Sequence, residues 1–375
     1  MFKLVRSRRA QIRGIDFSLA IIIFSLTMGQ VLLLTNTFID GNRSHIDFQE
    51  RQEFADSTAI QFVFTTGYSG FGQGTENWAS IPTNALLAEN WNLGLTTSGN
   101  IDPFKQSRMS NWTTSDYAIN YEVAKTGMNI SADYQIQILN PINVEITTIS
   151  DTTPTSIDVT GTVTKASKPL FGSEIWVYVV NNLGSVAQGY AASNSNGQFS
   201  INIAGLTNNQ FYTVVAISRF GLHSEDAAIT PYQKGTVAII PNYGNISLFE
   251  QIDDGYTVNV TSELDVSVDT ASVVALYPGL GQNSTNSIMS PLIANQWNGS
   301  LRVPPTKTIV FVVTGLLVDG TTVRSLAYVN FPLTLDDEIS NSLQPLKIKS
   351  STSSSQLVSI MTRGLLMNII LTIWD

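Results

Sequence analysis

The residue types that perform most enzyme chemistry are scarce in this chain. Its 375 residues include two histidines, His45 and His223, and no cysteine, which excludes thiolate nucleophiles, disulfides and thiolate metal sites. No H-E-x-x-H zinc motif, Walker-type phosphate loop or G-x-S-x-G nucleophile motif occurs. We therefore expect no catalytic residue, no metal site and no cofactor, and we expect both histidines to be exposed residues rather than ligands.

Neighbouring carboxylates occur at three places in the second half of the chain: Asp253-Asp254, Asp336-Asp337 and Glu263 with Asp265. Oxygen-rich loops could hold Ca²⁺, and a pair of carboxylates could act in a glycosidase. None of the three follows the D-x-[DN]-x-[DN]-G pattern of a calcium loop. The favoured interpretation is that they are solvated turn residues.

Seven asparagines begin an N-x-[ST] sequon, the acceptor motif for N-glycosylation. Chance is an alternative, because a chain rich in Asn, Ser and Thr yields several sequons anyway. The glycosylation candidates are Asn42, Asn111, Asn129, Asn245, Asn259, Asn283 and Asn298.

The basic residues are concentrated at the N-terminus. Five of them precede the first acidic residue, Asp16, and the remainder carries 15 basic and 29 acidic residues. An acidic body excludes nucleic acid as a partner, because phosphate binding needs clustered Lys and Arg. Residues 17–39 contain no charge, and about 35 Å of helix would cross a bilayer. The positive-inside rule then predicts a single-pass membrane protein with residues 1–14 in the cytoplasm and the rest outside.

Three interpretations of this N-terminus remain: a secretory signal peptide, an uncleaved signal anchor and a prepilin-type signal. The stretch RRAQIRGIDFSLAIIIF resembles the class III signal peptides of archaeal type IV pilin-like proteins. The resemblance implies cleavage by a prepilin peptidase, either after Gly14, leaving Ile15 first, or after Ala10, leaving Gln11 first. The family's acidic residue lies near the fifth mature position, which favours the second cut.

The resemblance also implies assembly into a homo-oligomer or with other pilin-like subunits through the apolar helix. Asp16 would pair with the N-terminal amine of a neighbouring subunit, or else face water as an interfacial charge. Small residues permit close helix packing. The assembly candidates are Asp16, Phe17, Ala20 and Gly29.

Residues 63–142 are expected to form a small α/β head behind a transmembrane and stalk helix over 15–62. Asp102-Pro103 predicts a capped short helix, and TTSDYAINYEVAKTGM predicts a helix capped by Ser115 or Asp116. ADYQIQIL alternates as a strand. The order of these segments resembles the head of archaeal pilin-like proteins, with matches at Trp78, Leu93-Gly94-Leu95, Asp102-Pro103-Lys105 and Tyr134-Gln135-Ile136. The loop before Trp78 lacks the family's prolines, Ile101 replaces a leucine, and the strand lacks an acidic residue after Tyr134.

Residues 143–235 predict a β-sandwich of short strands separated by turns. The outline V-x-G-x-V, P-L-x-G and S-N-x-N-G-x-F, from Val159 to Phe199, resembles carboxypeptidase-regulatory-like and other Ig-like surface modules. Asn196-Gly197 predicts a turn with positive φ. Residues 236–345 predict a second β-rich module, without a clear repeat of the first.

The C-terminal segment, residues 346–375, contains the stretch SSTSSSQ at residues 350–356, which is expected to be flexible. Two apolar runs then flank Gly364. A membrane helix is the rival interpretation, but Arg363 interrupts it, and the run that follows is too short to span. We expect a β-hairpin buried in a sheet. Several proteins of the pilin-like family end in such a pair of strands, and the resemblance therefore implies that the hairpin pairs with strand 133–139, so that residues 350–375 complete the head.

The fold class expected is therefore mainly β, with a long N-terminal α-helix, a small α/β head and two Ig-like sandwiches. The expected function is a non-enzymatic structural subunit of an archaeal surface filament, a pilin or minor pilin, exposing its β modules for spacing or adhesion. The alternative is a signal-anchored monomeric receptor or binding ectodomain.

Overall fold

The computed structural model describes residues 24–31, 49–50, 52–70, 78–97, 100–109, 119–131, 133–181, 183–235, 244–250, 257–264, 267–279, 284–293, 295–304, 307–317, 323–331, 354–362 and 365–374. The chain divides into two units, residues 1–54 and 55–375. In the first unit, residues 24–31 are helical. Among the described residues, none of the helices combines the length and apolar character needed to cross a bilayer. The single long N-terminal helix expected from the sequence is thus not established.

The head begins with a helix over residues 52–64, which buries one face. Ala55, Ala59 and Phe62 lie in the head core, at the spacing of three to four residues that is typical of an amphipathic helix. Small elements follow: β1 (Tyr68–Ser69), η1 (Trp78–Ser80), α2 (Thr83–Ala88), β2 (Trp91–Asn92), β3 (Thr96–Thr97), β4 (Asn100–Ile101), α3 (Pro103–Ser107), α4 (Tyr121–Met128) and β5 (Asp133–Leu139).

The capping prediction was correct for α3 and wrong for α4. The Asp102 carboxylate accepts hydrogen bonds from the amides of Phe104 (2.8 Å) and Lys105 (3.4 Å), with Pro103 at the first helical position. Helix α4 is capped instead by Asn120, whose side chain accepts from the Val123 amide at 3.0 Å. Asn120 is as good a cap as Ser or Asp, and it lies next to the apolar stripe that α4 buries.

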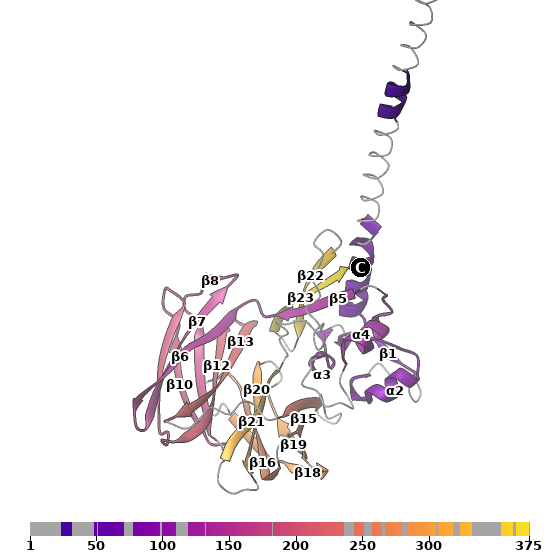
Figure 1. Ribbon diagram of the computed structural model, residues 1–375. Helices are drawn as coiled ribbons and strands as arrows, with labels where there is room; N and C mark the ends of the chain where they lie inside the picture. Colours follow the sequence, from indigo (N-terminus) through magenta and orange to yellow (C-terminus); the bar gives the residue numbers. More distant parts are fainter. Residues whose placement is uncertain are drawn as a thin grey trace, which may run out of the picture. The chain divides into compact units, whose positions relative to one another are not determined.

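The C-terminal hairpin completes the head sheet. Strands β22 (Ser354–Thr362) and β23 (Leu365–Trp374) pair antiparallel, and β23 pairs with β5 from Trp374 opposite Asp133 to Asn368 opposite Leu139. The sheet order is β3-β4-β22-β23-β5, with the yellow C-terminal strand beside the purple β5 in Figure 1. Ser354–Gln356 belong to β22, so the prediction of a flexible 350–356 segment was wrong there: backbone pairing with β23 outweighs the polar composition.

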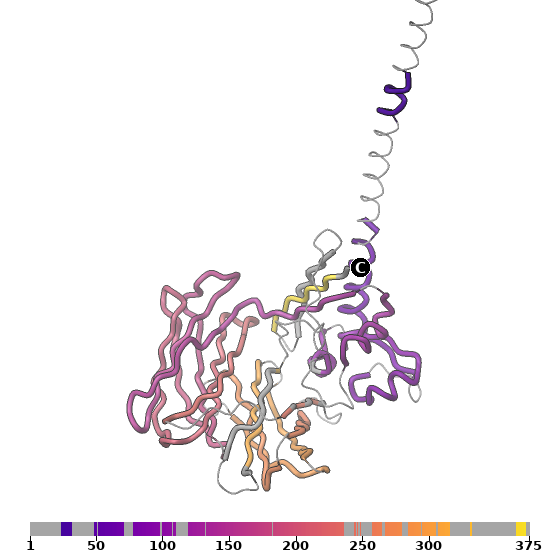
Figure 2. Tube along the Cα trace, viewed as in Figure 1, coloured from indigo at the N-terminus to yellow at the C-terminus, as the bar shows by residue number. Residues whose placement is uncertain are grey.

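The first sandwich lies in sequence between β5 and the hairpin, and Figure 2 lets the chain be followed from β5 into β6. Its sheets have the orders β11-β7-β6 and β10-β9-β12-β13. Its strands are β6 (Asn143–Thr153), β7 (Ser156–Lys165), β8 (Lys168–Pro169), β9 (Glu174–Asn181), β10 (Val186–Ala192), β11 (Gln198–Ala204), β12 (Gln210–Phe220) and β13 (Ser224–Lys234).

Two local features mark this sandwich as Ig-like. Gly197 has the positive φ (71°) expected of the Asn-Gly turn, and a Cβ there would lie 2.5 Å from the Val163 carbonyl oxygen. The Tyr212 hydroxyl donates to the Thr207 carbonyl (3.0 Å) and accepts from the Thr207 amide (2.7 Å). This return of a strand tyrosine to the preceding backbone is the tyrosine corner of Ig-like sandwiches.

The second sandwich repeats this topology, although the sequence shows no repeat. Its sheets have the orders β14-β15-β19-β18 and β17-β16-β20-β21. Its strands are β14 (Asn245–Glu250), β15 (Thr257–Glu263), β16 (Val268–Leu276), β17 (Ser284–Ile288), β18 (Ser290–Ile293), β19 (Gln296–Arg302), β20 (Ile309–Leu317) and β21 (Val323–Phe331). Phe104 of α3 joins its core, with its ring 5.0 Å from that of Phe331.

The two sandwiches pack against each other through one sheet of each. A separate buried cluster contains Trp176, Tyr178, Val180, Val215 and Ile217 from β9 and β12, and Val274, Leu276, Val310 and Val312 from β16 and β20. The Tyr178 hydroxyl also donates to the Tyr277 carbonyl at 2.7 Å. The runs IWVYVV and IVFVV are apolar at consecutive positions because their strands are buried on both faces. The four sheets therefore form a stack with two outer faces, that of β11-β7-β6 and that of β14-β15-β19-β18.

Candidate functional site

The residues predicted for processing and assembly lie almost entirely outside the described residues. This applies to Ala10, Gln11, Gly14, Ile15, Asp16, Phe17 and Ala20. Gly29 falls in the helical segment 24–31, where a Cβ would meet no atom within 4 Å in this chain. A close approach by another helix at Gly29 is thus sterically open. Cleavage and assembly stay predictions.

The sequons divide between described and undescribed residues. Asn42, Asn111 and Asn283 lie outside the described residues. Asn129 is exposed and ends α4 in the left-handed conformation (φ 55°). Asn245 lies in β14, Asn259 in β15 and Asn298 in β19, all in one sheet. The structure thus places in one sheet three sequons that are well separated in the sequence.

A shallow groove of about 520 Å³ is lined by β6, β7 and β11 of one sheet and by the end of β10 of the other. Hydroxyl and amide groups are frequent in its walls, and none of the described residues that line it is ionisable. The lining residues are Thr147, Thr160, Gly161, Thr162, Ala191, Ala192, Asn194, Gln198, Phe199 and Ser200. The register of β6 shifts between Ile146 and Thr148, a bulge of the kind that redirects side chains beside binding sites. Hydrogen-bonding groups without charge suit a neutral polar ligand.

Gly161 is the glycine among the residues that line this groove. A Cβ at Gly161 would lie 2.1 Å from the Glu145 carbonyl oxygen and 2.4 Å from the Phe199 ring. The glycine therefore lets β6, β7 and the Phe199 ring approach each other closely. The sequence singled it out only as part of the V-x-G-x-V outline.

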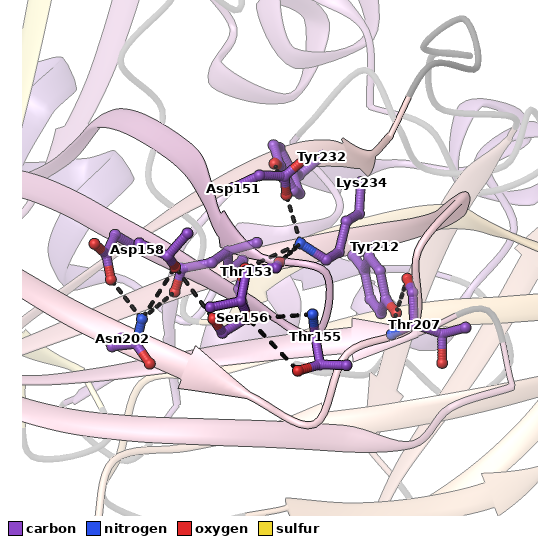
Figure 3. A network of polar contacts seen from close by, with 12 residues as sticks. Asp151, Thr153, Thr155, Ser156, Asp158, Asn202, Thr207, Tyr212, Tyr232 and Lys234 are labelled. Carbon is purple, nitrogen blue, oxygen red and sulfur yellow. Dashed lines mark hydrogen bonds and ion pairs between the residues drawn. The ribbon is translucent and has the colours of Figure 1, made fainter.

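A buried lysine ties the two sheets of the first sandwich together at one end (Figure 3). The Lys234 ammonium donates to the Asp151 carboxylate (2.6 Å) and to the carbonyls of Thr153 and Ser156 (both 2.9 Å). Lys234 is 1 % exposed, and the Tyr232 hydroxyl donates to the same carboxylate at 2.8 Å. Lys234 lies in β13 of one sheet, whereas its acceptors lie in β6 and β7 of the other.

The hydrogen bond from Lys234 holds the pKa of Asp151 below its ordinary value. A lowered folded-state pKa means that ionised Asp151 favours the folded state above its unfolded pKa, and that this contribution is lost as the pH falls through the folded pKa. Because the Asp151 side chain is 44 % exposed, solvent screens its ion pair with Lys234. The stabilisation therefore comes mainly from the hydrogen bonds of the buried lysine to the backbone carbonyls.

Replacing Lys234 with methionine is expected to lower the free energy of unfolding by about 2–3 kcal/mol, because the part-buried Thr153 carbonyl and the buried Ser156 carbonyl both lose their donor. The variant should also lose less stability than the wild type when the pH falls below about 4. Thermal melting of the detergent-solubilised full-length protein at pH 7 and pH 3.5 measures both effects. Lys168→Met, at an exposed lysine, is the matched control. An unchanged melting temperature for Lys234→Met would contradict the role of the clamp.

Two adjacent acids at the start of β13 hold a junction between the modules. The Asp226 carboxylate accepts from the Asn140 side chain and the Val144 amide, both at 2.7 Å, where β5 leads into β6. The Glu225 carboxylate accepts from the Thr308 amide at 2.7 Å, just before β20, and burial raises its pKa.

The carbonyl of His223 accepts from the Leu366 amide at 2.8 Å. His223 itself is exposed.

The buried cations of the head serve packing. Lys105, in the Asp-Pro-x-Lys segment, donates to the carbonyls of Thr66 and Thr96 at 2.7 Å. Arg108 donates to the carbonyls of Trp78 (2.6 Å) and Ile81 (2.7 Å). Within the described residues, no group of three His, Cys, Asp or Glu side chains could hold a metal ion.

No protein-family model and no curated protein sequence matches this chain. Among solved structures, it is similar to the sensor domain of the anti-sigma factor RsgI4 of Pseudobacteroides cellulosolvens, at 19% identity over 25% of this chain and 74% of that one, with a TM-score of 0.21. A two-domain fibronectin type III segment of chicken tenascin matches at 14% identity over 51% of this chain and 97% of that one, with a TM-score of 0.19. A tetra-tandem repeat from the extending region of a large adhesion protein matches at 17% identity over 52% and 49% of the two chains, with a TM-score of 0.23.

Proposed function

We propose that this chain is a non-catalytic cell-surface protein, a pilin-like subunit of an archaeal surface filament. Its N-terminal helix would anchor it in the membrane and then pack with neighbouring subunits, and its stacked sandwiches would be displayed outside. The carrying observation is that both sandwiches are inserted between β5 and β22 of the head sheet, and that helix 52–64 packs into the same head core. A head that joins the N-terminal segment to an inserted body is well suited to display.

The packing between the sandwiches supports a rigid display unit rather than a flexible chain of modules. Nine residues in that interface are at most 4 % exposed. Inter-domain motion is the usual expectation when an interface is small and polar, and an apolar one opposes it. A rigid unit holds its outer faces in a fixed orientation, which is useful for spacing and for adhesion.

The proposed adhesive surface is the groove on β11-β7-β6, and its ligand class is a neutral saccharide or similar polyhydroxyl compound. Hydroxyl and amide groups such as those of Thr160, Gln198 and Ser200 can exchange hydrogen bonds with sugar hydroxyls. The volume lies within the range of ligand sites, about 300–1,000 Å³.

Arginine at Thr160 is expected to fill the groove and to lower affinity for a neutral glycan at least about tenfold, or about 1.4 kcal/mol. Binding of the full-length protein to a panel of neutral oligosaccharides measures the effect. Thr257→Arg, on the opposite outer face, is the matched control and should bind like the wild type. Equal losses for the two variants, or no binding of any neutral glycan by the wild type, would contradict this assignment.

The test of the filament proposal is N-terminal sequencing of the protein from native membranes and from sheared surface material. A mature start at Gln11 or Ile15 in sheared filaments supports the pilin-like subunit. An intact Met1 that occurs in membranes alone would overturn it and favour the rival, a signal-anchored receptor or binding ectodomain.

A further inference from the structure

The sequons are unevenly distributed between the two sandwiches. Residues 143–235 contain eight asparagines and no N-x-[ST] sequon, whereas residues 236–345 contain four sequons, at Asn245, Asn259, Asn283 and Asn298. Both segments are rich in Ser and Thr, so composition alone does not separate them. One outer face of the stack therefore carries acceptor motifs, and the face with the groove carries none.

Two of these sequons lie directly opposite each other in the structure. In the register of β15 and β19, Asn259 pairs with Ser300, and Thr261 pairs with Asn298. Each sequon thus places its hydroxyl residue opposite the asparagine of the other. Because side chains alternate along a strand, the asparagine and the hydroxyl residue of one sequon share a face.

That shared face is the outer one. Their neighbours along the two strands, Val258, Val260 and Leu301, point the other way and are buried in the core of the second sandwich. Asn259 and Asn298 are partly exposed and Ser300 is exposed. In β14, Asn245 takes the register position opposite Glu263, at the end of the same sheet.

A hydrogen bond holds the Asn259 amide, whereas burial covers the side-chain oxygen of Asn298. The Ser300 hydroxyl donates to the Asn259 side-chain oxygen at 2.9 Å. The Asn298 side-chain oxygen is buried without a hydrogen-bond partner. In both residues the oxygen is the held or covered end of the amide, and the nitrogen is the atom that would accept a glycan.

We propose that Asn259 and Asn298 form one shared N-glycosylation site, at which a glycan on either asparagine prevents modification of the other. Diagonal neighbours on antiparallel strands are about 7–8 Å apart, so the first sugar on one amide covers the second. In the transfer, a lipid phosphate-linked oligosaccharide is the donor. The bond from its anomeric carbon to the phosphate oxygen breaks, a bond from that carbon to Nδ2 forms, and the amide proton leaves with the phosphate. The inference rests on the surface location proposed above.

The chain offers a direct way to count glycans at this pair. Trypsin leaves residues 235–302 as one peptide, because no Lys or Arg lies between Lys234 and Arg302. In protein from the native host carrying Asn245→Gln and Asn283→Gln, the mass of that peptide reports the pair alone. Most copies should carry one glycan and none should carry two. Cleavage after Glu263 then separates Asn259 from Asn298 and assigns the glycan.

Two variants of that background test the coupling. Thr261→Ala should move the glycan to Asn298, and Ser300→Ala should move it to Asn259, with the total remaining one. Two glycans on one peptide would overturn the shared site, and so would a bare peptide from protein that is modified at Asn42, Asn111 or Asn129. A chain bare at every sequon and starting at Met1 would overturn the surface location as well, which separates the two failures.

Discussion

Lysine at position 369 is expected to unfold the head while the sandwiches stay folded. Ile369 lies in β23, is 1 % exposed and packs in the head core with Tyr134 and Ile136 of β5. Lysine would replace a buried aliphatic side chain with a charge that finds no counterion among these apolar neighbours. The expected loss is about 4–5 kcal/mol of unfolding free energy, which is comparable to the whole stability of a small domain.

Hydrogen–deuterium exchange of the full-length protein in detergent can locate this effect. Protection should fall in β5, α4 and helix 52–64, and should persist in β9 and β12. Ile370→Lys is the matched control, because Ile370 is the next residue of the same strand but points to the half-exposed face. Similar losses of protection for both variants would show that β23 does not complete the core.

Aspartate at position 274 is expected to separate the sandwiches. Val274 is fully buried in the interface between them. An unpaired carboxylate there would cost about 4 kcal/mol or more, unless the two sheets part and admit water. Because each sandwich has its own core, we expect parting rather than global unfolding.

Two measurements report the separation of the sandwiches: limited proteolysis, and the change in Trp176 fluorescence when the interface opens. Cleavage between residues 235 and 245 should become faster than in the wild type, and thermal melting should split into two transitions. Thr270→Asp is the matched control, since Thr270 is an exposed residue on the same face of β16. If Val274→Asp melted like the wild type, the packing of the sandwiches would not contribute to stability.

The sequence predicted the strands that alternate or run apolar, and it missed those that do neither. Strands β7, β9, β11 and β12 alternate or run apolar in sequence, as expected of strands in a sandwich. Strand β6 reads NVEITTISDTT, with little apolar periodicity, because it is an edge strand whose outer residues face solvent. Strand β13 contains Pro231, which is tolerated because it too is an edge strand.

The C-terminal hairpin was predictable because its apolar runs flank a glycine and lack the length of a membrane span. The repeated topology of the two sandwiches was not, since it depends on strand order rather than on residue identity. The consecutive apolar residues of β9, β16 and β20 indicate strands that are covered on both faces, and they could have predicted the packing of one sandwich against the other.

The proposed groove and the proposed glycosylation pair were the hardest features to predict. Nothing in the order of residues places Asn259 opposite Ser300, because the register of β15 and β19 depends on long-range pairing. The groove likewise combines residues from β6, β7, β10 and β11, whose meeting depends on the bulge in β6 and on the missing side chain at Gly161.

The insertion of the sandwiches into the head sheet determines how mechanical load would travel through the protein. A pull on the sandwiches passes through two covalent connections, β5–β6 and β21–β22, and both β5 and β22 are hydrogen-bonded to β23. Strand β23 therefore links β5 and β22, the two strands through which force would enter the head. A force applied to the sandwiches would be shared by the two sets of inter-strand hydrogen bonds, β22–β23 and β23–β5, and would not fall on a single connection.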